Sequence, residues 1–318
     1  MRKQFPEELA DSSWDNTGLL LGAAPPSSST EVTTTGPPPS VLLTNDLTAQ
    51  VVDEALRENA RIIICYHPVI FRPLKSITTQ DPMQTQLLRL AAERISVYCP
   101  HTAMDGAVGG LNDWLCDILQ GSQPVPRRPI QPVSAAARAV LPPEQHQAAG
   151  YGRVLDLPHK VDLHTLLRRL NAGTTGSPYA AVALPHHLRL YDPGASAGQE
   201  QAPLIGKIAV CAGSGAGVFK DLDTGTSTSA KDADVELLVT GEMSHHDALR
   251  HTQLGRVVAT VFHSNSERRY LSDVLKPVLE ARLRDTPYAA TAEGAAARVV
   301  VSQADRDPFD IINIGPLA

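Results

Sequence analysis

Three histidines stand directly after apolar, strand-like segments of this chain, where an imidazole could bind a metal ion. His67 follows the run RIIICY and precedes Pro68, which cannot continue a β-ladder. His101 follows the segment SVYCP, and His263 follows VVATVF. In an open α/β sheet, ligands bind outside the carboxyl ends of the strands, so we expect these imidazoles near a sheet edge. Taken alone, His67 is more simply interpreted as a core or capping histidine bonded to a neighbouring carbonyl.

Two carboxylates accompany these histidines in the sequence. Asp105 lies four residues after His101, and Glu267 lies four residues after His263. Taken singly, Asp105 would be a turn residue, and Glu267 would complete a capping box that begins at Ser264. Capping does not account for His263, however. Three strand ends that deliver imidazoles, two of them with a carboxylate, predict a divalent metal site with mixed nitrogen and oxygen ligands.

The block VTGEMSHHDALRH adds a further carboxylate and two adjacent histidines. Glu242 could be a general base or a metal ligand, although a glutamate at the start of a helix is also favoured by the helix dipole. His245 and His246 would point in different directions on a helix, so at most one of them can reach a given site.

The segment CAGSGAGVF is rich in glycine but does not match a nucleotide-binding fingerprint. Gly213, Gly215 and Gly217 fail the GxGxxG pattern because the third glycine would have to stand at Val218. A nucleotide cofactor fold is therefore not supported. The segment could form a nest of backbone N–H groups that holds an anion, or a plain tight turn.

Strands and helices alternate along the first part of the chain. Thr48 can cap a first helix, and Asp81 followed by Pro82 can begin a second. This alternation predicts an α/β fold with parallel strands. The expected strands are 41–47, 61–66 and 96–100, and the expected helices are 49–60, 83–95 and 109–119.

The composition changes to Pro, Ala and Gln without periodicity over residues 121–150, which indicates a linker or surface excursion. We therefore expect a three-layer α/β/α main domain, formed by residues 1–122 and 255–318, with a smaller α/β domain inserted at 123–254. Three insertions read as flexible loops: PPSSSTEVTTTGPPPS, PGASAGQEQAP and DTGTSTSAKDA.

The charge and composition argue against several classes of function. With 28 Lys plus Arg against 34 Asp plus Glu, the net charge is −6, so we expect no direct contact with nucleic acid or an anionic membrane. No stretch approaches ~18 consecutive apolar residues, and no secretory signal is recognised. The four cysteines form no CxxC pair and read as reduced thiols, which predicts a cytosolic location, with the nucleus as a further possibility.

Together these motifs resemble the NGG-interacting factor three-like family, whose members are also described as GTP cyclohydrolase one type two homologues. The match covers most of the chain, and the wording of the YHP and GEMSHH blocks resembles the eukaryotic branch. The blocks that carry the resemblance are LADSSWDNTGLLLG (9–22), LTNDLTAQVVDEAL (43–56), YHPVIFRPLKSIT (66–78), PHTAMDGAVGGLNDWL (100–115), LVTGEMSHHDAL (238–249), HSNSERRYL (263–271) and SQADRDPF (302–309).

The resemblance implies an α/β chain of two domains, assembled into a toroidal homohexamer, with a two-metal site that faces an internal cavity. Tyr66 stands where bacterial members have the first histidine of a pair, and a neutral phenol is a poorer ligand than an imidazole. One of the two ions would then be weakly held or absent, or another group such as His101 would complete its coordination. Carried over by motif, the implied ligands are His67, Asp105, His263 and Glu267.

Two main classes of function follow from this reading. The first is a metal-dependent hydrolase for a small polar or nucleotide-like substrate, with Glu242 or His101 as a proton-transfer group and one or two divalent ions (Zn, Fe, Mn or Mg) per chain. The second is a non-enzymatic ring that binds a transcriptional regulator protein, as the family name suggests. A metal-handling protein would use the same ligands with an exchangeable ion.

Overall fold

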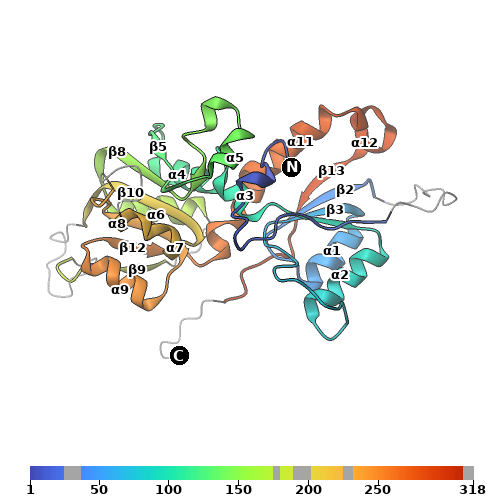
Figure 1. Ribbon diagram of the computed structural model, residues 1–318, viewed down its shortest axis with the longest axis horizontal. Coiled ribbons are helices and arrows are strands. Elements are labelled where there is room, and N and C mark those ends of the chain that lie inside the picture. The colour runs from blue at the N-terminus through green and yellow to red at the C-terminus, as the bar shows by residue number, and fades with distance from the viewer. Residues whose placement is uncertain (25–36, 175–179, 189–201, 225–231, 311–318) are drawn as a thin grey trace, which may run out of the picture.

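The computed structural model describes residues 1–24, 37–174, 180–188, 202–224 and 232–310 as a mixed α/β protein (Figure 1). This is the predicted fold class. Its strands form one sheet of five strands, one of six and a small one of two. The insertions predicted as flexible loops lie largely outside the described residues.

The five-stranded sheet is built from the two ends of the chain. Its order is β1-β4-β3-β2-β13, in which β1 is antiparallel to β4 and the other neighbours are parallel. The last described strand therefore returns to the first sheet, as expected. The bounds are β1 (Gly18–Leu21), β2 (Ser40–Thr44), β3 (Ala60–Cys65), β4 (Ser96–Cys99) and β13 (Arg298–Val301).

Both faces of the five-stranded sheet are covered, which makes a three-layer arrangement. Alternate residues of a strand point to opposite faces. Leu42 and Ile63 pack in a core with α1 (Ala49–Arg57) and α2 (Pro82–Ala92), whereas their neighbours Leu43 and Ile64 pack in the other large core, which contains Leu275. Figure 1 shows α1 and α2 on one side of this sheet and α11 (Lys276–Arg284) on the other. Continuous apolar strands are typical of such two-sided burial.

The six-stranded sheet has the order β5-β8-β10-β11-β12-β9, and β10, β11 and β12 run parallel. We assigned the strand at 257–260 to the first domain, but β12 pairs with β11 in this second sheet. The domain boundaries near residues 122 and 255 remain a proposal. The bounds are β5 (Arg127–Arg128), β8 (Arg153–Asp162), β9 (Ala181–Ala183), β10 (Leu204–Ser214), β11 (Leu237–Glu242) and β12 (Val257–Thr260).

Helices cover the second sheet as well. One core contains Leu115 and Leu166 together with Val210, and the other contains Phe219 with Leu238. These side chains come from helices on opposite faces of the sheet. The helices on the first face are α4 (Leu111–Gln120) and α6 (Leu163–Gly173), and those on the second are α7 (Ala216–Phe219), α8 (Asp221–Thr224) and α9 (His245–Gln253).

The segment 121–150, which we expected to be a linker or surface excursion, folds against the body of the protein. Ile130, Val133 and Leu141 are buried. Its elements are too short to show periodicity in the sequence, which is why composition alone indicated a linker. Besides β5, they are β6 (Gln131–Pro132), α5 (Ala135–Ala139), the 3-10 turn η2 (Pro143–Gln145) and β7 (Gly150–Tyr151), and β6 pairs with β7.

The predicted helix starts at Thr48 and Asp81 are confirmed, because each side chain accepts a hydrogen bond from a backbone N–H in the first turn of its helix. Residues 268–284 form a helical segment that contains a π-helical turn just before Pro277, which has no backbone N–H to donate. The parts of this region are η3 (Ser264–Ser266), α10 (Arg268–Tyr270), the π-helical turn η4 (Leu271–Leu275) and α11.

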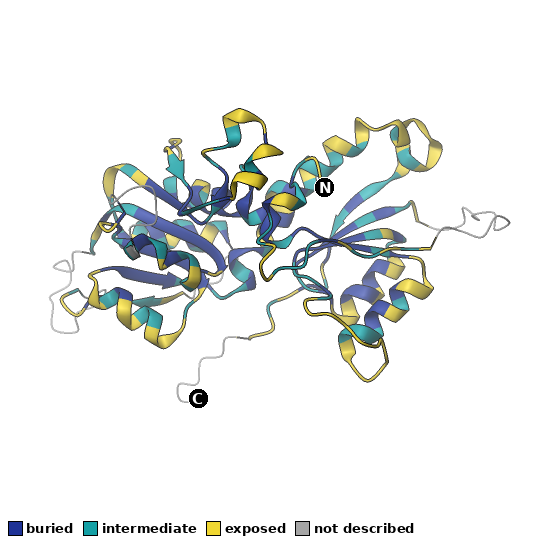
Figure 2. Ribbon diagram, viewed as in Figure 1, coloured by how far each residue is buried: buried dark blue, intermediate teal, exposed yellow. Residues whose placement is uncertain are grey.

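One hydrophobic core joins the two sheets. Ile64 of the first sheet and Ile208 of the second belong to the same cluster, which also contains Trp114 and Tyr270. Figure 2 shows the strands of both sheets largely in the dark blue of buried residues. Among the described residues, no helix is long and apolar enough to cross a membrane. The remaining elements are η1 (Glu7–Leu9), α3 (His101–Gly106), η5 (Pro287–Ala290) and α12 (Ala292–Ala296).

Candidate metal centre

The predicted strand-end histidines come from both sheets. His67 lies just beyond β3 of the five-stranded sheet, and His263 lies just beyond β12 of the six-stranded one. Their rings are 5.2 Å apart between centroids. We expected these side chains near a sheet edge, and the structure brings together the carboxyl ends of parallel strands from two different sheets.

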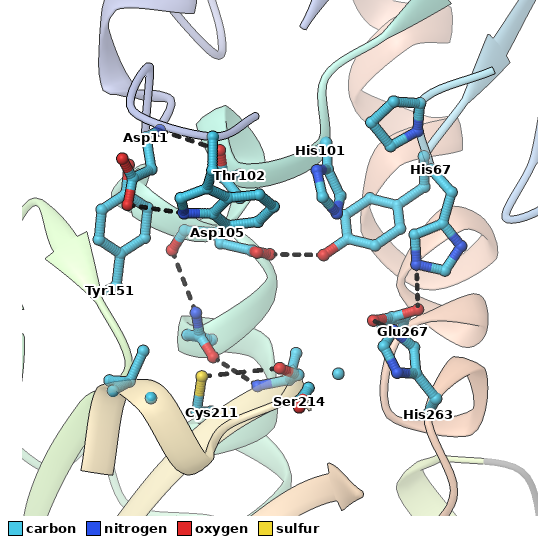
Figure 3. Close-up of a pocket in the computed structure, with 18 of the residues that line it drawn as sticks. Asp11, His67, His101, Thr102, Asp105, Tyr151, Cys211, Ser214, His263 and Glu267 are labelled. Atoms are coloured by element: carbon cyan, nitrogen blue, oxygen red, sulfur yellow. Dashed lines mark hydrogen bonds and ion pairs between the residues drawn. The ribbon is translucent and has the colours of Figure 1, made fainter. Parts of the chain in front are cut away.

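Three of the predicted ligands form a compact group. His67, His263 and Glu267 each offer a ligand atom, and these atoms all lie within 4.8 Å of one another. The His67 Nε2 atom is 3.4 Å from Glu267 Oε2, and the His263 Nε2 atom is 3.3 Å from Oε1 of the same carboxylate (Figure 3). The Glu267 side chain is only 1% exposed. A buried carboxylate therefore lies between two imidazoles.

The outer nitrogen of each histidine faces a second carboxylate. His67 Nδ1 is 2.8 Å from Asp46 Oδ1, and His263 Nδ1 is 3.0 Å from Glu242 Oε1. Metal-binding histidines usually donate their other N–H to a carboxylate, which fixes the ring orientation and the tautomer. Here that arrangement leaves the Nε2 atoms directed at Glu267.

The charges of this group fit a divalent cation. When each Nδ1–H donates to its outer carboxylate, a neutral imidazole presents the Nε2 lone pair to the Glu267 carboxylate, which is itself only an acceptor. A proton or a cation must lie between them. Among the described residues, no lysine or arginine forms an ion pair with Glu267. Two imidazole nitrogens and one carboxylate are a donor set that Zn²⁺, Fe²⁺ and Mn²⁺ accept.

A proton takes the place of the cation in the metal-free chain. Burial lowers the pKa of His67, but the hydrogen bond to Asp46 and the negative charge of Glu267 outweigh it and raise the pKa to about 9. His67 is therefore an imidazolium at neutral pH when no metal is bound.

An asparagine side chain holds the Glu267 carboxylate in this position, and a glycine leaves room for it. Asn45 Nδ2 donates to Glu267 Oε2 at 3.0 Å. Gly213 has a φ of +61°, and a Cβ atom there would lie 2.6 Å from Glu267 Oε1, so the end of β10 closes on the carboxylate because it carries no side chain. The capping-box interpretation of Glu267 is wrong, since its carboxylate contacts Asn45 and the two histidines.

Asp105 lies in the same pocket but outside the three-residue group. The Tyr66 hydroxyl donates to Asp105 Oδ1 at 2.8 Å (Figure 3). Burial raises the pKa of Asp105 to about 6 and, together with the charge of Asp105, raises that of Tyr66 well above its usual value. A neutral tyrosine thus contacts a carboxyl group that changes its protonation near neutral pH.

His101 forms a separate pair with a carboxylate that sequence reasoning missed. Its Nδ1 atom is 2.7 Å from Asp15 Oδ1, and the Asp15 side chain is fully buried. The hydroxyl of Thr102 donates to the other oxygen of Asp15. His101 lies just beyond β4, as expected, and begins α3, with a φ of +31°. Asp15 lies in the block 9–22 that contributed to the resemblance, and this was its one signal in the sequence.

These groups line a pocket of about 850 Å³, which has the size of ligand-binding cavities. Glu242 touches His263 from outside the lining, and His245 and His246 are exposed at the start of α9. The lining includes Trp14, Tyr66, His67, Phe71, His101, Asp105, Tyr151, Gly213, Val218, His263 and Glu267.

The fold and this site define an α/β protein with a candidate divalent-metal centre between two sheets. The chain belongs to the Duf34/NIF3 (NGG1p interacting factor 3) family, whose model matches residues 1–308. It is 39% identical to the protein NIF3 homolog of Schizosaccharomyces pombe, over 95% of this chain and 92% of the relative. It is 36% identical to NGG1-interacting factor 3 of Saccharomyces cerevisiae, over 97% and 93%. The family resemblance is confirmed.

Solved structures share the fold at lower sequence identity. A Bacillus cereus protein related to NIF3 superposes with a TM-score of 0.70 at 20% identity, covering 98% of this chain and 96% of that one. Reduced HcgD from Methanocaldococcus jannaschii superposes with a TM-score of 0.63 at 18% identity, covering 94% and 93%. The arrangement of two sheets is therefore common to these chains.

Proposed function

We propose that this chain is a metal-dependent hydrolase for a small polar or nucleotide-like substrate. The observation that carries the proposal is the buried Glu267 carboxylate, which lies between the Nε2 atoms of His67 and His263. Their outer nitrogens are fixed by Asp46 and Glu242. When bound there, a divalent ion would polarise a substrate oxygen and lower the pKa of a water molecule towards ~7.

The chain's own residues would then move protons around the bound substrate. His101 is the proposed proton-transfer group: Asp15 holds its Nδ1 atom, which leaves Nε2 available to the pocket. We expected Glu242 as a general base or ligand. Its contact with His263 Nδ1 at 3.0 Å supports an orienting role instead.

A second ion, which the family resemblance implies, would use Asp105. That carboxylate already accepts a hydrogen bond from the Tyr66 hydroxyl. Burial raises the pKa of Asp105 to about 6, so a proton also competes with a metal ion for this carboxylate. We therefore propose that the ion at His67, His263 and Glu267 is held more tightly than any ion at Asp105.

The test is the metal content per chain of full-length protein, purified without an affinity metal, for wild type beside His263→Ala and Glu267→Gln. We expect about one tightly held divalent ion in the wild type, its loss in both variants, and loss of hydrolysis in a screen of phosphate and amide substrates. Metal well below one ion per chain in the wild type would contradict the proposal.

A second candidate is a non-enzymatic adaptor that binds a transcriptional regulator. It is supported by the name of the Saccharomyces cerevisiae relative, NGG1-interacting factor 3, which is 36% identical to this chain. The ring-shaped homohexamer and the cytosolic or nuclear location belong to this proposal as well, and the four free, buried cysteines fit a reducing compartment. If the chain is an adaptor, the His263→Ala variant should still bind the partner protein. If it is a hydrolase, that variant should lose activity but keep its oligomeric state.

A further inference from the structure

Two aromatic side chains in the candidate pocket are open to solvent. Trp14 is 51% exposed and Phe71 is 46% exposed, although both line the same pocket as the metal group. Their ring centroids are 5.9 Å apart with an interplanar angle of 49°. Large aromatic side chains are usually covered, and an open aromatic pair in a concave site indicates a surface that a ligand covers.

Hydrogen bonds fix this aromatic pair before any ligand binds. The indole N–H of Trp14 donates to Asp11 Oδ2 at 2.9 Å, so the face of the ring is the part left for contact. The side chain of Asn16 donates to the carbonyl of Ile70, which ties the loop of Trp14 to the loop of Phe71. Such preorganisation lowers the entropy lost on binding.

A row of rings connects the aromatic pair to the metal group. The centroids of Trp14 and His101 are 5.8 Å apart, those of His101 and His67 are 5.6 Å apart, and those of His67 and His263 are 5.2 Å apart. Figure 3 shows His101, His67 and His263 along one side of this pocket. A ligand of moderate length can therefore contact both ends at once.

We propose that Trp14 and Phe71 form a stacking subsite for a planar aromatic or heteroaromatic ring, whose carbonyl or anionic oxygen reaches the group of His67, His263 and Glu267. The proposal rests on the proposed metal-dependent reaction for its polar end. It narrows the substrate class from small polar molecules to compounds that join a flat ring to an oxygen ligand. Binding of the flat ring depends only on Trp14 and Phe71.

The test is isothermal titration calorimetry of the full-length protein with naphthalene-2-carboxylate and with decahydronaphthalene-2-carboxylate, a saturated compound of similar size. The protein is used after EDTA treatment and again after loading with Zn²⁺. We expect the flat ligand to bind about tenfold more tightly than the saturated one. We expect Trp14→Leu and Phe71→Leu to remove that preference and Trp14→Phe to keep most of it. Leu254→Ala, an exposed site outside the pocket lining, is the control.

The two proposals fail in different ways in this experiment. If Zn²⁺ has no effect but the flat ligand is still preferred and the preference depends on Trp14, the stacking subsite holds and the metal-dependent reaction is wrong. If Zn²⁺ strengthens the binding of both ligands equally and Trp14→Leu leaves both affinities unchanged, the stacking subsite is overturned. It is also overturned if Trp14→Leu leaves ligand binding intact but changes the oligomeric state, because the pair is then an interface between copies.

Discussion

The two nitrogens of each imidazole have separate tasks in the candidate metal centre. Nε2 of His67 and of His263 faces the shared carboxylate of Glu267, and each Nδ1 faces an outer carboxylate. Removing an outer carboxylate therefore leaves the ligands in place but releases their orientation. A mutation of an outer carboxylate therefore tests the orientation of an imidazole without removing a metal ligand.

We predict that Asp46→Asn lowers metal affinity about 10- to 100-fold, because the amide oxygen is a weaker acceptor for His67 Nδ1–H than the carboxylate. Competition with a fluorescent chelator measures the change. Asp53→Asn is the matched control, since Asp53 forms an exposed ion pair with Arg89 and neither residue lines the pocket. Equal affinities for the Asp46 variant and wild type would contradict the orienting role.

We predict that metal affinity rises with pH up to about 9. The pKa of His67 is raised to about 9 by Asp46 and Glu267 against the effect of burial, so below that pH a metal ion must displace a proton. Apparent affinity should increase about tenfold per pH unit between ~7 and ~8.5. Titration calorimetry in two buffers with different ionisation enthalpies measures the proton released. Binding that releases no proton at pH 7.5 would count against this assignment.

We predict that Tyr66→His increases the metal content per chain. The phenol now donates to Asp105 and keeps that carboxylate from a metal, whereas an imidazole is a good ligand in the same place. Mass spectrometry of the purified protein measures the content, with circular dichroism to check folding, because Tyr66 is buried. An unchanged content in a folded variant would mean that Asp105 is not a metal ligand.

At the scale of elements, the end of β10 is as important to the site as the histidine-bearing segments. Gly213→Ala would place a Cβ atom 2.6 Å from Glu267 Oε1 and force a left-handed φ of +61° on an alanine. We expect a loss of about 1–2 kcal/mol in the free energy of unfolding, together with weaker metal binding. Urea unfolding measures the first and the chelator assay the second.

Gly217→Ala is the control for this prediction. It lies in α7, and a Cβ atom there meets nothing within 4 Å, so we expect the substitution to be neutral or to stabilise by ~0.5–1 kcal/mol. If both alanine variants behave alike, the close approach of Gly213 to Glu267 does not determine stability.

The elements also explain what could be predicted from the sequence. The parallel strands of the first sheet and the helix starts at Thr48 and Asp81 were predicted because their signals are local. The pairing of β12 with β11 was missed because we placed a domain boundary between these two strands, and the packing of residues 121–150 was missed because their short elements show no periodicity.

The candidate site divides in the same way. His67, His263 and Glu267 were found because histidines follow apolar runs and Glu267 has a fixed spacing from His263. The partners Asp15 and Asp46 were missed, since an acidic residue in a loop gives no periodic signal. Only the folded chain shows which carboxylate accepts from which imidazole nitrogen.

At the scale of the whole molecule, the candidate metal centre links the two sheets. His67 extends from β3 of one sheet, and His263 extends from β12 of the other. A bound ion would therefore hold both sheets and stabilise the folded chain in proportion to its binding. At a free concentration 100 times the dissociation constant, that stabilisation is about 2.7 kcal/mol.

We predict that EDTA lowers the melting temperature of the wild-type protein and that added Zn²⁺ or Mn²⁺ restores it, since the ion binds the native state more tightly than the unfolded chain. Differential scanning calorimetry at several metal concentrations measures the shift. Glu267→Gln should melt at one temperature with or without metal, because the buried carboxylate that joins the two histidines is gone. Asp53→Asn should respond like wild type. If metal stabilises the Glu267 variant as much as wild type, the ion binds elsewhere and the link between the sheets is not a metal site.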